Sequence, residues 1–144
     1  MSALRARPAE ERDAQILATL VTQLGYPSTP EQVRARLQRV AGHPDIQALV
    51  AERDFGVVGM IALMVFPAIH RDGLHGYITA FVVDKSERGN GAGTGLLAAA
   101  EAWFTARGVS KINLTTALHR ESAHRFYERR GYEFDGRRYV KTPS

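Results

Sequence analysis

Two stretches near the start of the chain carry apolar residues at spacings of three and four, the pattern of a helix with one buried face. The first begins near Glu10 and ends before Gly25, a residue type that readily takes the left-handed conformation of a helix end. Its apolar face consists of Leu17, Leu20, Val21 and Leu24. A short strand is expected before it, within residues 1–7, ended by Pro8.

The second helical stretch has a complete start signal. Thr29 is placed to cap it, Pro30 takes the first helical position, and Gln32 can close a capping box. Its expected buried stripe is Val33, Leu37 and Val40. Gly42 lies just past its end.

The middle of the chain changes to strand patterns. Apolar segments at residues 46–52, 57–66 and 75–83 are separated by turn signals at 54–56 and 71–73. Because the turns are short, these three strands are expected to form an antiparallel meander.

The pattern after the meander alternates again between helix and strand. A glycine-rich loop at 88–93 leads into a helix whose apolar face is Leu96, Leu97, Ala100, Trp103 and Phe104. A strand at 111–117 follows, and strand, helix and strand in this order predict a parallel βαβ crossover. A helix at 121–130 and short strands at 132–134 and 138–141 complete the chain. The predicted class is α+β, with a mixed, mostly antiparallel central sheet flanked by helices and one central βαβ crossover.

Composition narrows the class of protein. The chain has 144 residues, 44% apolar and 24% charged, which predicts a single globular domain spanning 1–144. It has no cysteine, so neither a disulfide nor a thiolate nucleophile is possible. No apolar run approaches the roughly 20 residues that cross a bilayer, and no secretory signal is recognisable at the start. We therefore expect a cytoplasmic protein without membrane contact.

Basic charge is concentrated toward the C-terminus. The formal net charge is +4, and residues 119–144 alone hold seven basic and four acidic side chains, a net of +3. A solvated helix face explains such an excess, and so does attraction to a polyanionic ligand or to nucleic acid.

The segment with the clearest chemistry is the loop that follows the third meander strand. Glycines at 89, 91, 93 and 95 let backbone N–H groups approach a ligand, and the following helix adds its positive end. Arg88 adds a guanidinium suited to phosphate. A nucleotide P-loop would need Gly-Lys-Ser/Thr, and the glycine spacing does not fit a dinucleotide fold. The pattern predicts an anion cradle, with pyrophosphate as its natural guest.

This loop, Arg88-Gly89-Asn90-Gly91-Ala92-Gly93, resembles the coenzyme-binding signature of the GNAT superfamily of N-acetyltransferases. A second element, residues 120–132, is similar to that family's C-terminal helix pattern. Its residues in register are Ala123, Phe126, Tyr127, Gly131 and Tyr132. Arg120 departs from the pattern, because many members have an asparagine there that contacts the coenzyme. The predicted order of elements also matches the family over essentially the whole chain.

The resemblance implies transfer of an acetyl group from acetyl-CoA to an amine, without a metal ion. It places the pantetheine arm along Phe81, Val82 and Val83, with the Val83 N–H as a donor to the thioester oxygen. It places the phosphates at the loop, through Arg88, Gly89, Asn90, Gly91, Ala92, Gly93, Thr94 and Arg120. Tyr127 is the expected general acid for the departing thiolate.

The group that deprotonates the amine is left open. The family's usual glutamate has no counterpart in residues 76–80, and the candidates elsewhere are Glu52, Asp72 and His75. Each also has a structural explanation, as a surface strand residue, a turn residue and a strand-edge residue, and a water chain could serve instead. Tyr26, His70 and Asp72 are expected near the acceptor. Negative charge from Asp13, Glu52 and Asp72 favours a small-molecule amine.

Several alternatives stay open at this point. The acceptor could be a protein N-terminus or a lysine, or the domain could bind CoA without turnover. A basic nucleic-acid-binding module would leave the glycine loop unexplained. Such a module would use Arg120, Arg125, Arg129, Arg130, Arg137 and Arg138. The resemblance also leaves a homodimer open, since dimers are common in the family.

Overall fold

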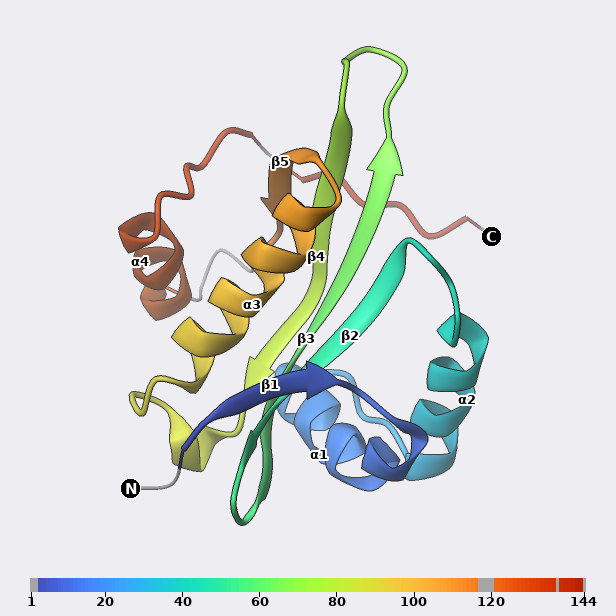
Figure 1. Cartoon of the computed structure of the whole chain (residues 1–144), viewed down its shortest axis with the longest axis vertical. Helices are drawn as coiled ribbons and strands as arrows, with labels where there is room; N and C mark the ends of the chain where they lie inside the picture. Colours follow the sequence, from blue (N-terminus) through green and yellow to red (C-terminus); the bar gives the residue numbers. More distant parts are fainter. Residues whose placement is uncertain (1–2, 117–120, 137, 144) are drawn as a thin grey trace. The chain divides into compact units, whose positions relative to one another are not determined.

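The sheet follows the predicted meander. A computed structural model describes residues 3–116, 121–136 and 138–143. Within them the sheet has the order β1-β2-β3-β4-β5 (Figure 1). The strands are β1 (Arg5–Pro8), β2 (Ile46–Arg53), β3 (Gly56–Pro67), β4 (Leu74–Val83) and β5 (Val109–Leu114). The neighbouring pairs from β1 to β4 are antiparallel.

The last sheet neighbours, β4 and β5, run in the same direction. Ser110 Oγ donates to the Leu74 carbonyl at 3.2 Å, and Asn113 Nδ2 donates to the Gly76 carbonyl at 3.3 Å. Partners therefore advance together along both strands, as in a parallel pair. The mixed sheet and the βαβ crossover confirm the predicted α+β class.

The chain divides into two compact units, residues 1–113 and 114–144, and each contains helices. The first unit contains η1 (Glu11–Asp13), α1 (Ala14–Leu24), α2 (Pro30–Val40), η2 (Lys85–Glu87) and α3 (Ala92–Ala106). The second contains α4 (Glu121–Arg129). The expectation of a single domain stays a prediction.

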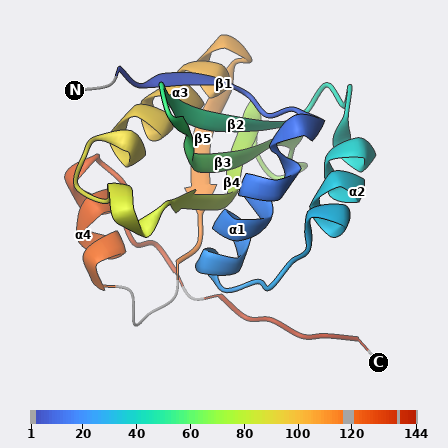
Figure 2. The same ribbon diagram turned by 90° about the horizontal axis from the view of Figure 1, so that it is seen from below.

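Helices α1 and α3 cover opposite faces of the sheet (Figure 2). Met60 and its cross-strand partner Val82 lie in the core cluster with the buried face of α1. A side chain at the neighbouring Gly59 would instead meet Leu96 of α3, with its Cβ 3.0 Å from Leu96 Cδ1. Since successive strand residues point to opposite faces, the sheet is the middle layer of three.

Glycine lets α3 approach the sheet closely at its other end. A Cβ built on Gly76 of β4 would lie 2.7 Å from the ring of Phe104, which is fully buried. The aromatic ring therefore occupies the space that a larger residue at this position would fill. This contact fixes α3 across the strand that leads to the glycine loop.

The two predicted helix signals are confirmed. Thr29 Oγ1 accepts from the Gln32 N–H at 3.1 Å, and Gln32 Oε1 accepts from the Thr29 N–H at 2.9 Å. Gly25 ends α1 with a φ of 118°. Of the stripe expected on α2, Val33 is buried, whereas Leu37 and Val40 are half-buried.

Some predicted strand boundaries are wrong. The strand expected at 111–117 begins at Val109, because Gly108, with a φ of 75°, turns the chain directly from α3 into the sheet. It ends at Leu114, and residue 117 lies outside the described residues. Pro8 belongs to β1, at the edge of the sheet, where a missing N–H is tolerated.

The two short strands expected at 132–134 and 138–141 are absent from the described part of that region. Alternating apolar residues favour a strand only when a neighbour pairs with it. Among the described residues no strand covers Phe134, Tyr139 and Val140, and their apolar side chains are exposed.

Candidate active site

An extra residue in β4 determines which way the side chains and backbone N–H groups point at the C-terminal end of the strand. Ala80 pairs with Ala62, but Ile78 pairs with the next residue, Leu63, so that Thr79 forms a β-bulge. The bulge reverses the faces of the strand. Before it the even-numbered Gly76 faces α3, and after it the odd-numbered Val83 faces the same helix.

The backbone of Val83 points away from β3. The N–H of the next residue, Asp84, donates to the Val58 carbonyl at 2.8 Å. In an antiparallel ladder the N–H groups of successive residues alternate in direction. The Val83 N–H is therefore directed to the opposite side of β4, the side on which β5 lies. Phe81 and Val83 are half-buried and Val82 is buried in the α1 core.

A tight turn connects this strand end to the loop. Asp84 caps η2 by accepting from the Ser86 N–H at 2.9 Å, and the Ser86 hydroxyl adds a second hydrogen bond at 2.6 Å. These bonds from Ser86 lower the pKa of Asp84 below its ordinary value. Gln23 of α1 clamps the same turn, because its amide donates to Asp84 Oδ2 and accepts from the Lys85 N–H, each at 3.2 Å.

The predicted anion cradle is an exposed loop in front of α3. Arg88, Gly89, Asn90 and Gly91 are all exposed. Gly89 and Gly91 have φ values of 85° and 88°, which other residues rarely adopt. Ala92, at the start of α3, is buried, so the helix begins directly behind the exposed loop. The positive end of α3 and its first backbone amides therefore face the loop.

Gly95 has a different role from the loop glycines. A Cβ at this position would lie 2.7 Å from Leu4 Cδ2, whereas nothing lies within 4 Å of one at Gly89 or Gly91. Gly95 thus allows the N-terminal segment to pack against α3, and the two loop glycines serve the backbone conformation.

A buried arginine from β2 holds the loop from the inside. Arg53, only 8% exposed, donates from Nε to Glu87 Oε1 at 2.6 Å and from Nη2 to the Asn90 carbonyl at 2.8 Å. The sequence did not single out Arg53 or Gln23. Polar residues near the end of a strand or helix are normally exposed. No local pattern reveals that the partners of Arg53 and Gln23 lie more than thirty residues further along the chain.

The residues expected from the C-terminal motif lie in the second unit. Tyr127 of α4 packs its ring edge-to-face against Phe126 and Tyr132, with centroid distances of 5.5 and 5.9 Å. The Arg130 guanidinium stacks 3.7 Å above the Phe126 ring. Gly131, with a φ of 87°, ends the helix as predicted. Arg120 lies outside the described residues, and the role of Tyr127 stays a prediction.

One candidate base, Glu52, is held in an ion-pair cluster. Its carboxylate accepts from Arg5 at 2.7 Å and from Arg7 at 3.1 Å. Hydrogen bonds from Arg7 and then Arg5 lower its pKa to about 2. A carboxylate so stabilised is a poor proton acceptor. Because Arg7 also pairs with Asp13, two of the three carboxylates expected to attract a cationic acceptor already have cationic partners.

The other candidate bases lie at the far end of β4. Asp72 is exposed in the β3–β4 turn, and His75 is buried, with its ring stacked 5.6 Å from that of Phe66. His75 and Phe81 are six residues apart, about 20 Å along an extended strand. Neither side chain is therefore beside the Phe81–Val83 strand end.

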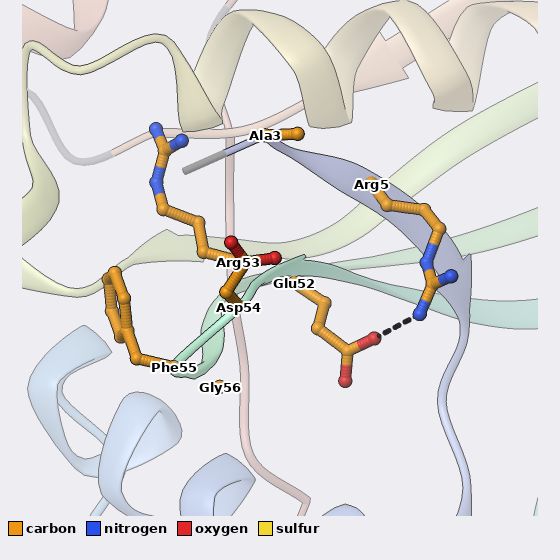
Figure 3. A pocket seen from close by; sticks show the side chains of 7 residues that line it. All are labelled: Ala3, Arg5, Glu52, Arg53, Asp54, Phe55 and Gly56. Carbon is orange, nitrogen blue, oxygen red and sulfur yellow. Dashed lines mark hydrogen bonds and ion pairs between the residues drawn. The ribbon is translucent and has the colours of Figure 1, made fainter. Parts of the chain in front are cut away.

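A hollow of about 560 Å³ opens at the β2–β3 hairpin (Figure 3). It is lined by residues that include Arg5, Glu52, Arg53 and Phe55. Arg5 reaches Glu52 across one side of it, while the guanidinium of Arg53 extends in another direction, toward its loop partners.

Two further observations concern the described residues only. They contain no helix with the length and apolar character needed to cross a membrane. They also contain no cluster of three or more His, Asp or Glu side chains arranged to hold a metal ion.

A family profile described as "Acetyltransferase (GNAT) family" matches residues 14–132. The chain belongs to the GNAT acetyltransferase family. This GNAT protein is 33% identical over 142 residues to an aminoalkylphosphonate N-acetyltransferase of Salmonella typhimurium, covering 96% of this chain and 90% of the relative. It is 31% identical over 130 residues to an IAA acetyltransferase of Azospirillum brasilense, covering 89% and 81%.

The fold of this GNAT protein also matches solved acetyltransferases. An aminoglycoside N-acetyltransferase solved in complex with CoA superposes with a TM-score of 0.86 at 16% identity, over 99% of this chain and 96% of that one. The family match and the acetyltransferase relatives confirm the expected activity. This GNAT protein is an acetyl-CoA-dependent N-acetyltransferase.

Proposed function

We propose that this acetyltransferase transfers the acetyl group of acetyl-CoA to a primary amine on a small molecule, by direct attack through a tetrahedral intermediate. The observation that carries the proposal is the exposed loop from Arg88 to Gly91, with two left-handed glycines, between the end of β4 and the start of α3. A pyrophosphate fits this arrangement of amides, helix end and guanidinium.

In the proposed complex, the phosphates of CoA bind the loop residues Arg88 to Thr94, and the pantetheine arm lies along Phe81, Val82 and Val83. Arg120 is a further proposed phosphate contact. The direction of the Val83 N–H, away from β3, supports its role as the donor to the thioester oxygen when that oxygen becomes negative.

The proposed chemistry has two bond changes and two proton transfers. The neutral amine attacks the thioester carbon, the C–S bond breaks, and the thiolate leaves with a proton from Tyr127. The amine loses its own proton to water, since Glu52 is held in its ion pairs and Asp72 and His75 lie at the far end of β4. Tyr127 suits the acid role because a phenol, with an ordinary pKa near 10, is protonated at neutral pH.

The preference for a small-molecule acceptor is supported by similar proteins. One relative is an aminoalkylphosphonate N-acetyltransferase, and one structural neighbour is an aminoglycoside N-acetyltransferase. The test is CoA release with a panel of amines: aminoalkylphosphonates, aminoglycosides, polyamines, amino acids and peptides with a free N-terminus or lysine. Saturable turnover of a small amine supports the proposal. Turnover of peptides alone would overturn the small-molecule assignment, and CoA binding without any turnover would indicate a silent domain.

A further inference from the structure

The contact between Arg53 and the Asn90 carbonyl has a consequence for the loop's donors. A trans peptide unit is planar, and its C=O and its N–H point in opposite directions. No peptide bond in the described residues is cis. Because the Asn90 carbonyl is drawn toward Arg53 at 2.8 Å, the N–H of Gly91 points away from Arg53. Arg53 is buried and Gly91 is exposed, so an N–H that points away from Arg53 is directed to the outer side of the loop.

The neighbouring donor in the loop is used differently. The Asn90 N–H closes a turn by donating to the Glu87 carbonyl at 3.2 Å. The orientation of the Gly91 amide therefore does not follow from the turn alone. It is fixed by the hydrogen bond that its own peptide unit accepts from the guanidinium.

Arg53 also compensates a charge that opposes anion binding. Glu87 lies one residue before Arg88, and its carboxylate would repel a phosphate near the loop. Arg53 Nε lies 2.6 Å from Glu87 Oε1, and the two side chains are only 7% and 13% exposed. Shielded from solvent in this way, the guanidinium offsets the carboxylate and leaves the positive charge of Arg88 to act outward.

We propose that Arg53 is a positioning residue for the coenzyme loop: it orients the Gly91 amide toward the pyrophosphate and neutralises Glu87. This inference rests on the proposed binding of CoA at the loop. Arg53 touches neither the amine nor the thioester in this proposal. Its loss should therefore affect only the binding of donors that carry a pyrophosphate.

The test compares two acetyl donors, acetyl-CoA and S-acetylpantetheine, which lacks the pyrophosphate and the nucleotide. For Arg53→Met we expect the KM for acetyl-CoA to rise about tenfold, with kcat and the KM of the amine within twofold of wild type. The kcat/KM for S-acetylpantetheine should be unchanged. Arg107→Met removes an exposed guanidinium from the opposite end of α3 and should leave all of these values at the wild-type level.

Two milder variants keep the test decisive if Arg53→Met folds poorly. Arg53→Lys keeps the cation but lacks the forked guanidinium that reaches Glu87 and the Asn90 carbonyl. Its KM for acetyl-CoA should therefore lie between the wild-type value and that of Arg53→Met. Glu87→Gln keeps an oxygen for Arg53, leaves the Asn90 contact in place and removes the charge that opposes a phosphate, so its KM for acetyl-CoA should be equal to or lower than that of wild type. A raised KM in Glu87→Gln would contradict the neutralising role.

Equal losses with both donors, or a fall in kcat with unchanged KM, would overturn the positioning role and indicate a structural one. Failure of the proposed function has a different signature. Wild-type enzyme would then show no preference for acetyl-CoA over S-acetylpantetheine, whatever Arg53 does.

Discussion

The guanidinium of Arg7 donates two hydrogen bonds to the carboxylate of Asp13, each 2.9 Å long. The same guanidinium also donates to Glu52. Arg7 of β1 therefore links Asp13, just before α1, to Glu52 of β2. Burial raises the pKa of Asp13, but the bonds from Arg7 and from the Glu10 N–H outweigh it and keep that pKa below its ordinary value. The pKa of Glu52 is lowered to about 2.

This cluster predicts a loss of stability in acid. A carboxyl whose folded pKa is depressed stabilises the fold fully above its unfolded pKa, about 4.3 for Glu, and loses that contribution as the pH falls through its folded value. The melting temperature should therefore fall between about pH 4.5 and pH 2. Glu52→Gln should flatten this decline. Glu31→Gln, at an exposed position on α2, is the control and should leave the acid profile unchanged. An identical profile for Glu52→Gln would contradict the prediction.

Arg88→Ala should weaken CoA binding about ten- to a hundredfold, since a hydrogen bond to a charged group contributes about 1.5–3 kcal/mol. The side chain is exposed, so the melting temperature without ligand should stay within about a degree of wild type. Isothermal titration calorimetry measures the affinity. CoA affinity equal to that of wild type would refute the phosphate contact.

Comparing Gly91→Ala with Gly42→Ala distinguishes the effect of backbone strain on stability from the effect of the loop conformation on CoA binding. Both glycines have positive φ values, 88° and 74°, and open space around a built Cβ. Each substitution should cost about 1–2 kcal/mol of stability through the left-handed conformation. Only Gly91→Ala should also weaken CoA binding, because only Gly91 lies in the loop. Equal CoA affinity in the two variants would show that the loop conformation does not matter for the coenzyme.

Tyr127→Phe should lower kcat on the order of 10²–10⁴-fold if the hydroxyl donates the proton to the thiolate. The ring and its packing against Phe126 and Tyr132 are kept, so CoA affinity and melting temperature should change little. Tyr139→Phe alters an exposed tyrosine and serves as the control. Under conditions in which chemistry limits the rate, wild-type kcat in Tyr127→Phe would assign the proton to water.

Local signals in the sequence predicted those features whose causes are local. The Thr29–Gln32 capping box forms between residues three apart, and the left-handed Gly25, Gly89 and Gly91 reflect a property of glycine itself. The anion cradle was visible for the same reason, since loop, helix start and Arg88 are contiguous.

Features that depend on distant partners were missed or predicted wrongly. Arg53 finds Glu87 and Asn90 only after β2 has been placed beside the loop, and Glu52 becomes a poor base only because Arg5 and Arg7 arrive from β1. The expected strands at 132–134 and 138–141 had the right composition but no pairing among the described residues. In each case the structure depends on a contact, or the lack of one, with residues far away in the sequence, which a local pattern does not reveal.

The bulge at Thr79 divides β4 into two parts whose even-numbered residues face opposite sides of the sheet. Upstream, even positions face α3; downstream, odd positions do, and the Val83 N–H is turned away from β3. Deleting one residue beside Thr79 would remove the bulge and keep the later pairs with β3 in register. Inserting one residue between Ala80 and Val82 without a second bulge would turn the Val82 side chain out of the α1 core and bring the Val83 N–H into the ladder with β3. A change of side chain in this short segment keeps that arrangement, whereas an added residue changes which side chains and which backbone N–H groups the end of β4 presents.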